Sequence, residues 1–505
     1  MTPPTRTINA WPPGLRHKRC CRVAATIILD TPLAFESQSH LPAVRFDPRG
    51  KRHVDYRAVI ALAGPLFINS ALQAVLSLTD TWFIGRLSVD AVAAMGATFF
   101  LVLVFILLFG CVGMSVQTLA AQNYGARRYD DAAKAVWTGL YAMLLVSPLF
   151  VAVALMGHTL LAPFHLEPNI ERLALEYWFP RLVGAPFGVA FWAISGFFNG
   201  IGRTKVTLAV TAGVVVVNAV LNEVFIFRLG LGMAGSAWAT TLSLLFGALA
   251  AGWLFLHPAI NEKFRCRRQW RFDGKALRKL FALGVPMGLF ATVDLFGFAL
   301  FQLMQVQLGP VAGAATQIVM MLTSTVFYPA LGLAMAATTL VGQSIGAGDK
   351  DWAMRIGTAV TMLAVAYMGS AGILLAILGP WLVPLFVTGG DGSGAAVIQL
   401  GATLLWIASA YQIFDALNMG SSFCLRGAGD VKTPAIALMF LSWCGFVPLA
   451  HMLTFAPGQG WVDFLPHVGL GAIGGWIAAV IYIFLLGMLL FWRWRSGAWR
   501  KIKIL

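Results

Sequence analysis

LGATLLWIASAYQIFDALNMGSSFCLRGAGDVKTP, residues 400–434, is the stretch that decides the fold. Its apolar part is about 25 residues long, which is enough for a helix that crosses a bilayer. The stretch ends at a glycine-rich, basic turn that contains Arg426, Gly427, Gly429 and Lys432 and closes at Pro434. The sequence therefore predicts a membrane helix with a basic loop at one end.

One carboxylate, Asp415, lies near the middle of this predicted helix, and Tyr411 lies on the same face one turn earlier. A charge at bilayer depth costs about 3 kcal/mol even on the mildest scales. Asp415 is either a buried polar group that a neighbouring helix satisfies or a functional residue. Acids inside membranes mark ion and substrate pathways, so we interpret Asp415 as functional.

The composition indicates a polytopic membrane protein. Of the 505 residues, 59% are hydrophobic and 11% are charged, whereas soluble domains are about 25% charged. The mean hydropathy is +0.77. The net charge of +15 fits the excess of Lys and Arg in cytoplasmic loops of membrane proteins. We expect the lipid bilayer, and no nucleic acid, as a partner.

Residues 1–52 differ from the rest because they are rich in Pro, Arg and His. The apolar run 23–35 is short, is interrupted by Asp30 and Pro32, and precedes no small-residue cleavage site, which argues against a signal peptide. We expect a disordered cytoplasmic tail, or residues that precede the native start.

Twelve apolar segments follow, each long enough to span a membrane. They cover residues 57–85, 91–121, 133–156, 178–200, 206–227, 233–256, 278–307, 312–342, 353–378, 397–424, 433–455 and 469–492. This pattern predicts an all-α fold that is divided into an N-lobe (53–256, helices 1–6), a basic linker (257–277), a C-lobe (278–492, helices 7–12) and a basic tail (493–505).

Basic residues are distributed unequally between the two sides of the predicted membrane domain. The loops after even-numbered helices and the C-terminal tail are basic, whereas those after odd-numbered helices have little beyond Arg86, Arg172 and Arg228. Because Lys and Arg accumulate in cytoplasmic loops, this asymmetry predicts that both termini face the cytoplasm.

Three motifs recur in the two halves of the chain. Residues 122–126 (QNYGA) recur as 343–347 (QSIGA), 200–205 (GIGRTK) as 427–432 (GAGDVK), and 229–235 (LGLGMAG) as 468–474 (VGLGAIG). Each half has an even number of helices, so both halves insert in the same orientation. Parallel repeats of this kind build two bundles related by an axis along the membrane normal, which is a transporter architecture.

Motifs of soluble enzymes occur only in unsuitable contexts. Residues 230–235 and 469–474 fit GxGxxG, but neither follows an isolated strand or has an acid at the expected distance. Residues 342–346 fit GxSxG but lie at the end of a membrane helix. The six cysteines lack disulfide or metal-site spacing. We therefore expect no enzyme activity, no cofactor and no structural metal.

Polar residues inside the predicted spans are the candidates for function. Asp80 lies toward the outer end of helix 1, where it could also reach the interface or pair with Arg86. Asp294 and Asp415 lie at similar depths in helices 7 and 10. Helix 5 carries Asn218, Asn222 and Glu223, and the two asparagines share a face. Such a set could hold Na⁺ through oxygen ligands or exchange a proton.

Residues 57–492 resemble the multidrug and toxic compound extrusion (MATE) family of transporters, including its NorM-like and DinF-like branches. The resemblance rests on Pro65 with residues 79–81 (TDT), QNYGA, NAVLNEVFIF at 218–227, LGMAGSAWAT at 231–240, Pro286 with Asp294, GQSIGAGD at 342–349, and the stretch 411–434. It implies a V-shaped, two-lobe antiporter in the bacterial inner membrane. Such an antiporter would export lipophilic, often cationic compounds in exchange for Na⁺ or H⁺.

The resemblance also implies site residues. Asp294, Tyr411 and Asp415 match the cation site of the NorM-like branch, so Asp294 and Asp415 are candidate Na⁺ ligands. A second proposed cation or proton site matches the positions Asp80, Asn218, Asn222 and Thr240.

Many relatives have Asp followed by Pro where this chain has Asn222 and Glu223. This departure moves our expectation for coupling to the C-lobe, and the match to the NorM-like pattern favours Na⁺.

We expect a monomeric drug exporter, and two other functions are compatible with a polytopic membrane protein. A flippase for lipid-linked oligosaccharides from the wider superfamily is the alternative. Such proteins tend to have a basic cavity and often fourteen helices, whereas this chain has twelve predicted helices with acids at mid-depth. A membrane-embedded enzyme is disfavoured because no catalytic constellation is present in the sequence.

Overall fold

The computed structural model describes residues 41–164, 166–387, 392–462, 466–502 and 504. In this part of the chain twelve helical spans are long and apolar enough to cross a membrane, which confirms the predicted number and fold class. The first half comprises α2 (Tyr56–Gly85), α3 (Val89–Met114), α4 (Val116–Gly125), α5 (Tyr129–Leu155), α6 (Gly157–Leu161), η1 (Ala162–Phe164), α7 (Pro168–Gly200), α8 (Thr204–Asn222), the π-helix η2 (Glu223–Arg228) and α9 (Gly232–Phe255).

The second half follows a short connection formed by α10 (Pro258–Phe264) and η3 (Cys266–Arg268). It comprises α11 (Gly274–Gln307), α12 (Pro310–Gly346), α13 (Lys350–Leu382), η4 (Val383–Phe386), α14 (Gly392–Ala428), α15 (Lys432–Phe440), the π-helix η5 (Leu441–Phe446), α16 (Val447–Thr454), α17 (Gly471–Arg495) and η6 (Ala498–Lys501).

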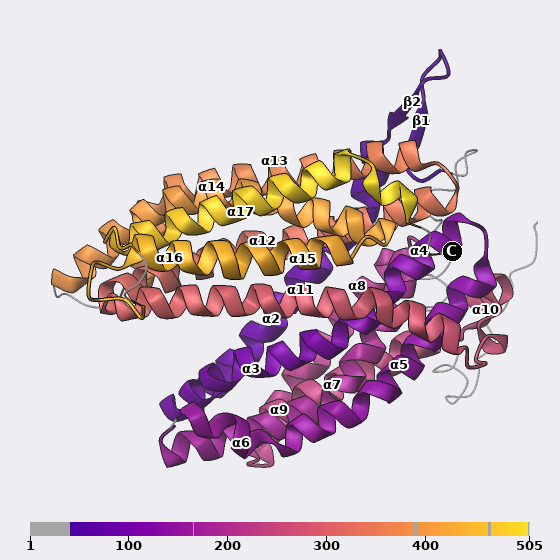
Figure 1. Cartoon of the computed structure of the whole chain (residues 1–505). Coiled ribbons are helices and arrows are strands. Elements are labelled where there is room, and N and C mark those ends of the chain that lie inside the picture. The colour runs from indigo at the N-terminus through magenta and orange to yellow at the C-terminus, as the bar shows by residue number, and fades with distance from the viewer. Residues whose placement is uncertain (1–40, 165, 388–391, 463–465, 503, 505) are drawn as a thin grey trace, which may run out of the picture.

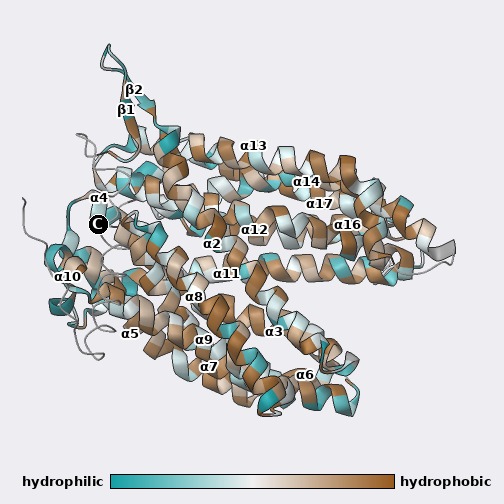
Figure 2. Ribbon diagram, turned by 180° about the vertical axis from the view of Figure 1, so that it is seen from behind, coloured by the Kyte–Doolittle hydropathy of each residue, from teal (hydrophilic) through white to brown (hydrophobic). Residues whose placement is uncertain are grey.

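The helices form two bundles that lie close together at one end and diverge toward the other (Figure 1). We call α2–α9 the N bundle and α11–α17 the C bundle. The end that carries the basic loops, α10 and the C-terminus is called the basic end. Hydrophilic residues gather at the ends of the bundles, and hydrophobic residues run along the helices between them (Figure 2).

Helices α2 and α11 connect the two bundles near the basic end. Val59, Leu62 and Leu66 of α2 belong to the buried core of the C bundle. Conversely, Leu280 and Leu283 of α11 belong to the buried core of the N bundle. Each half thus contributes the beginning of its first long helix to the core of the other half.

The N-terminal segment differs from the sequence-based expectation. Residues 1–40 of the predicted tail lie outside the described residues, but residues 44–54 form an antiparallel hairpin of β1 (Val44–Phe46) and β2 (Arg52–Val54). The prediction of disorder through residue 52 is therefore wrong for this part. Asp47 explains the turn, because its Oδ1 accepts hydrogen bonds from the Arg49 and Lys51 amides.

The hairpin is attached to the beginning of α13. Arg52 forms an ion pair with Asp349, the N-cap residue of α13. The buried Trp352 donates a hydrogen bond from Nε1 to the Pro42 carbonyl (2.9 Å). These contacts hold the segment before α2 against the C bundle.

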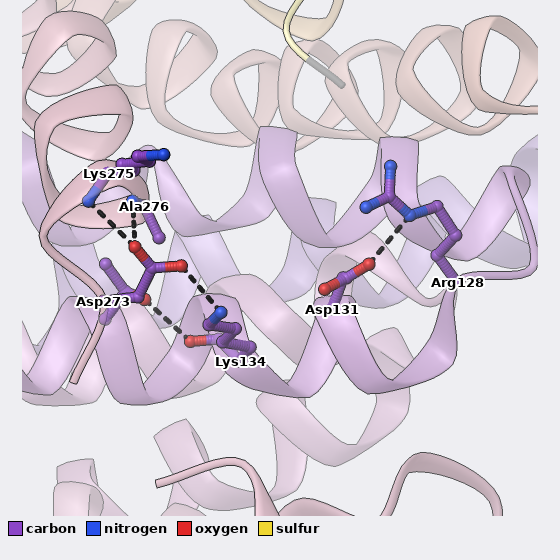
Figure 3. A network of polar contacts seen from close by, with 7 residues as sticks. Arg128, Asp131, Lys134, Asp273, Lys275 and Ala276 are labelled. Carbon is purple, nitrogen blue, oxygen red and sulfur yellow. Dashed lines mark hydrogen bonds and ion pairs between the residues drawn. The ribbon is translucent and has the colours of Figure 1, made fainter. Parts of the chain in front are cut away.

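The connection between the bundles is anchored to α5 at the basic end (Figure 3). Lys134 of α5 forms an ion pair with Asp273 (2.7 Å), which caps α11 by accepting from the Lys275 and Ala276 amides. An N-cap of this kind contributes about 1 kcal/mol to a helix. The predicted basic linker therefore contains helical structure and fixes the beginning of α11.

Candidate functional site

The four predicted polar residues of the N bundle meet around the Asp80 carboxylate, which is 8% exposed. Its Oδ1 accepts hydrogen bonds from Asn218 Nδ2 (3.0 Å) and Asn222 Nδ2 (2.8 Å). Its Oδ2 accepts from Thr240 Oγ1 (2.8 Å). We call this group the Asp80 site. Three helices, α2, α8 and α9, supply it, so residues distant in the sequence converge on one carboxylate.

Local helix geometry fixes the donors of the Asp80 site. Asn218 and Asn222 are one turn apart on α8, and Asn222 Nδ2 also donates to the Asn218 carbonyl (3.0 Å). Directly after Asn222 the helix widens into the π-helix η2, a feature that often marks functional sites. Gly235 of α9 allows close packing there, since a Cβ would lie 3.0 Å from the carbonyl carbon of Phe225.

Two arginines of the N bundle, Arg86 and Arg181, lie in the region of the Asp80 site but differ in role. Arg86 places its guanidinium over the rings of Trp82 (5.1 Å) and Phe227 (5.3 Å). The alternative in which Arg86 pairs with Asp80 is therefore not the arrangement in the structure. Arg181 of α7 interacts electrostatically with Asp80. Sequence analysis did not single out Arg181, although an arginine inside an apolar span is itself a signal.

Arg181 owes its position to the packing of α7 against α9. Thr241 Oγ1 donates a hydrogen bond to the carbonyl of Pro180, the residue before Arg181 (2.9 Å). Gly184 lets the helices touch, because a Cβ there would lie 2.2 Å from Thr241 Oγ1. Since Thr240 binds Asp80, adjacent residues of α9 connect the carboxylate to the helix that carries Arg181.

The C bundle holds a second acidic group, formed by Asp294 of α11 and Asp415 of α14, which we call the paired-acid site. The two carboxylates interact electrostatically. Asp294 Oδ1 accepts a hydrogen bond from the Tyr482 hydroxyl of α17 (3.2 Å). Asp415, 6% exposed, has a longer contact from Asn418 Nδ2 (3.4 Å). The structure thus brings the two predicted acids into one site with neutral hydrogen-bond partners.

Tyr411 also belongs to this region. Its ring packs edge-on against Phe298 of α11 (centroids 6.0 Å), and the residue interacts electrostatically with both Asp294 and Asp415. Tyr411 therefore lies beside the two acids, as expected from its position one turn before Asp415.

Tyr482 and Asn418 were missed by sequence reasoning. Asn418 could have been found, because it follows Asp415 by three residues and shares its helical face. Tyr482 lies on a different helix, and no spacing rule identifies it. Its ring stacks on Phe446 of the π-helix η5 (4.8 Å). A π-helix therefore adjoins the acidic site in each bundle.

The chemistry of the paired-acid site suits a small, hard cation. Carboxylate, phenol and amide oxygens are ligands for such ions. Among the residues that the structure describes, no group of three or more His, Cys, Asp or Glu side chains could hold a metal.

Two bundles of membrane helices, each with a buried acidic site, define a polytopic transporter. The MatE family model matches residues 65–224 and 286–450, which is more than half of the chain. The chain therefore belongs to the MATE family of transporters, and it is a transporter rather than an enzyme.

Relatives support this assignment over nearly the full length. The chain is 31% identical over 461 residues to a probable multidrug resistance protein NorM of Bradyrhizobium diazoefficiens, covering 89% of this chain and 95% of the relative. It is 33% identical over 443 residues to the multidrug resistance protein NorM of Burkholderia vietnamiensis, covering 86% and 92%.

A solved structure of a multidrug resistance MATE family transporter in an outward-facing conformation matches the fold. The TM-score is 0.77 at 20% identity, with 88% of this chain and 96% of that chain covered. At this identity the likeness supports the fold alone.

Proposed function

We propose that this protein is a multidrug antiporter that exports lipophilic, often cationic compounds in exchange for Na⁺ or H⁺. The relatives named as multidrug resistance proteins support the substrate class. The single observation that supports cation coupling is the pair Asp294 and Asp415 inside the C bundle, with Tyr482 and Asn418 as neutral partners. An oligosaccharide flippase lacks a corresponding observation in this structure.

The proposed mechanism rests on charge compensation. Two carboxylates in a low-dielectric site repel each other, and either a Na⁺ or a proton relieves the repulsion. A cationic drug attracted to the same charges would compete with the coupling ion. Binding of the ion from outside would then expel the drug, and release of the ion inside would restore the site. The match of the acids to the NorM-like pattern favours Na⁺.

The experiment is dye efflux from proteoliposomes with an imposed Na⁺ or H⁺ gradient. We expect a cationic dye to leave against its gradient with one of the two ions and not with a K⁺ gradient. Protein that is folded and oriented but moves dye with neither ion would overturn the proposal.

We infer the orientation of the protein in the membrane from its basic end. Because that end carries the 257–279 loop and the C-terminal basic residues, we place it and both termini in the cytoplasm of a bacterial inner membrane. Both bundles and both sites come from one chain, so we propose a monomer. A cysteine at residue 268 should be protected from an impermeant label in intact cells, and one at 461 should react. Labelling of 268 from outside contradicts this orientation.

A further inference from the structure

The repeated motifs QNYGA and QSIGA contact each other's half of the molecule at the basic end. Gln122 Nε2 of α4 donates to the Gly427 carbonyl at the end of α14 (2.9 Å). Gln343 Nε2 of α12 donates to the Gly200 carbonyl at the end of α7 (2.8 Å). The two glutamines are equivalent in the repeat, and so are the two glycines. Each half therefore donates one of these two hydrogen bonds to the other half and accepts the equivalent bond from it.

A second reciprocal pair lies one turn earlier on the same two helices. Thr118 Oγ1 donates to the Arg426 carbonyl (3.2 Å), and Thr339 Oγ1 donates to the Asn199 carbonyl (3.0 Å). Thr118 and Thr339 are equivalent by the spacing of the QNYGA and QSIGA motifs, and the two acceptors directly precede Gly200 and Gly427. The four hydrogen bonds therefore follow the two-fold relation of the halves.

Two glycines bring the backbones of α4 and α12 into contact at the same place. A Cβ at Gly125 would lie 2.0 Å from the Gln343 carbonyl oxygen, and one at Gly346 would lie 1.9 Å from the Gln122 carbonyl oxygen. Real Cβ atoms do not approach oxygen this closely, so any larger residue separates the helices. These glycines, at equivalent positions of the repeat, set the distance at which the reciprocal hydrogen bonds form.

The donors of this contact are almost fully shielded from water. Thr118, Gln122, Thr339 and Gln343 are exposed by 1%, 2%, 0% and 4%. A buried donor or acceptor that loses its partner is strongly disfavoured, so the bonds oppose any partial separation of the bundles. Gln117 Nε2 adds two bonds across the same surface, to the Met335 carbonyl (2.9 Å) and to Thr339 Oγ1 (3.0 Å), so opening this end requires water to replace these bonds as well as the four reciprocal ones.

We propose that these four reciprocal hydrogen bonds and two glycine contacts form a latch that holds the basic end closed and that must open in every transport cycle. The latch concerns the separation of the two bundles, so it does not depend on which cation or drug is transported. Because each bond opposes the same opening motion, loss of one glutamine should shift the equilibrium by the same factor as loss of its equivalent.

The test measures the distance between spin labels on noncanonical residues at 205 and 432, which keeps the natural cysteines in place. Lys205 and Lys432 are exposed, occupy equivalent positions and lie in the first turns of α8 and α15 at the basic end. In the full chain without substrate or gradient, the wild type should give one narrow, short distance. Gln122→Ala and Gln343→Ala should each raise the population of longer distances about fivefold, and the double variant about 25-fold.

The matched control is Asn123→Ser, next to Gln122. Serine is chosen because the other repeat has serine at the equivalent position. Asn123 is buried, but its Nδ2 donates to Leu119 of its own helix (2.9 Å), so the distance should not change. Gly125→Ala and Gly346→Ala should lengthen the distance further. If these glycine variants fail to fold, the glutamine variants still test the latch.

The latch proposal is overturned by a wild-type distance that is already long, by glutamine variants that keep the short distance, or by an equal shift in Asn123→Ser. Because the distance is measured without transport, a chain that fails the efflux assay still reports on the latch. A short distance in both glutamine variants of an active transporter would reject the latch and leave the proposed function intact.

Discussion

In the N bundle, Asp80 accepts three hydrogen bonds from Asn218, Asn222 and Thr240 at 2.8 to 3.0 Å. In the C bundle, Asp294 and Asp415 accept one bond each among the described residues, at 3.2 and 3.4 Å. Both oxygens of Asp80 are thus occupied by short bonds, whereas the paired acids keep lone pairs that a cation can use. The same fold therefore holds one carboxylate that is satisfied and two that are not.

The charged residues around the two sites also differ. Asp80 interacts with Arg181, so its region carries one negative and one positive side chain. Asp294 and Asp415 interact with each other and with tyrosines. Two like charges create a demand for a cation that the Asp80 site does not have. We infer that the Asp80 site acts on the position of helices, and the paired-acid site on the coupling ion.

The largest expected effect tests the paired-acid site directly. Asp294→Asn with Asp415→Asn should reduce cation-driven dye efflux to the level of protein-free vesicles, because the charge that binds the ion is gone. Asp294→Glu should keep part of the activity because the charge remains. Asp351→Asn, at an acid whose side chain is 79% exposed, is the matched control. Normal efflux by the double variant under either gradient would move coupling to the N bundle.

A smaller effect is expected at Asp80. Asp80→Asn keeps the shape, and the new amide can still donate to Thr240 Oγ1, but the substitution removes the charge that strengthens these bonds and faces Arg181. The expected cost is about 1–3 kcal/mol. We expect efflux about tenfold slower with normal membrane insertion. Asp90→Asn, at an exposed acid of the same bundle, should behave as the wild type. Unchanged efflux in Asp80→Asn would return Asp80 to a purely structural role.

A second acid in the Asp80 site should remove the difference between the two sites. Asn222→Asp replaces the donor of a 2.8 Å bond with a second carboxylate at Asp80, which should destabilise the protein by about 1–3 kcal/mol. Low pH or Na⁺ should recover part of this loss in thermal unfolding, because the site would then resemble the paired-acid site. An equal recovery in Asn222→Ala, which removes the same donor without adding an acid, would show that the effect is not specific.

The smallest effect lies outside both sites, at the ion pair of Lys134 and Asp273. The hydrogen bond from Lys134 lowers the pKa of Asp273 to about 2, from its ordinary value of 3.8. A lowered carboxyl pKa gives stability that is present above about pH 4 and is lost as the pH falls toward 2. Because the pair is about a third exposed, Lys134→Met should cost at most about 1 kcal/mol at neutral pH.

The difference between Lys134→Met and the wild type should disappear in thermal unfolding as the pH falls from 4 to 2. Arg128→Met removes the neighbouring pair with Asp131, whose arginine is 53% exposed, and should have less effect. A difference that persists at pH 2 would contradict the assigned cause. Efflux at neutral pH should be unchanged in both variants.

Hydropathy and the family resemblance predicted two parts of the molecule. Twelve spans follow from hydropathy alone, and the meeting of Asp80 with Asn218, Asn222 and Thr240 follows from the family resemblance. The N-terminal hairpin could have been found from Asp47, Pro48 and Gly50, which favour a turn. Its strands have three residues each, which is too short for a periodic pattern to show.

Contacts between helices outside the positions that the family resemblance covers were beyond sequence reasoning. Nothing in the order of helices indicates that Tyr482 of α17 reaches Asp294, or that α2 and α11 enter the cores of opposite bundles. The π-helices η2 and η5 have no distinct sequence signature, since their extra residue changes only the hydrogen-bond register. The repeated glutamines were visible as a pattern, but their partners in the other half required the packing of the bundles.

The reciprocal bonds of Gln122 and Gln343 have a consequence for how such a protein can change by mutation. In an assembly of two identical halves, one substitution would remove both bonds at once. In a single chain the two glutamines are specified separately, so one mutation removes one bond and leaves the other. The opening equilibrium can therefore change in small steps, while each half remains free to acquire an acidic site of its own.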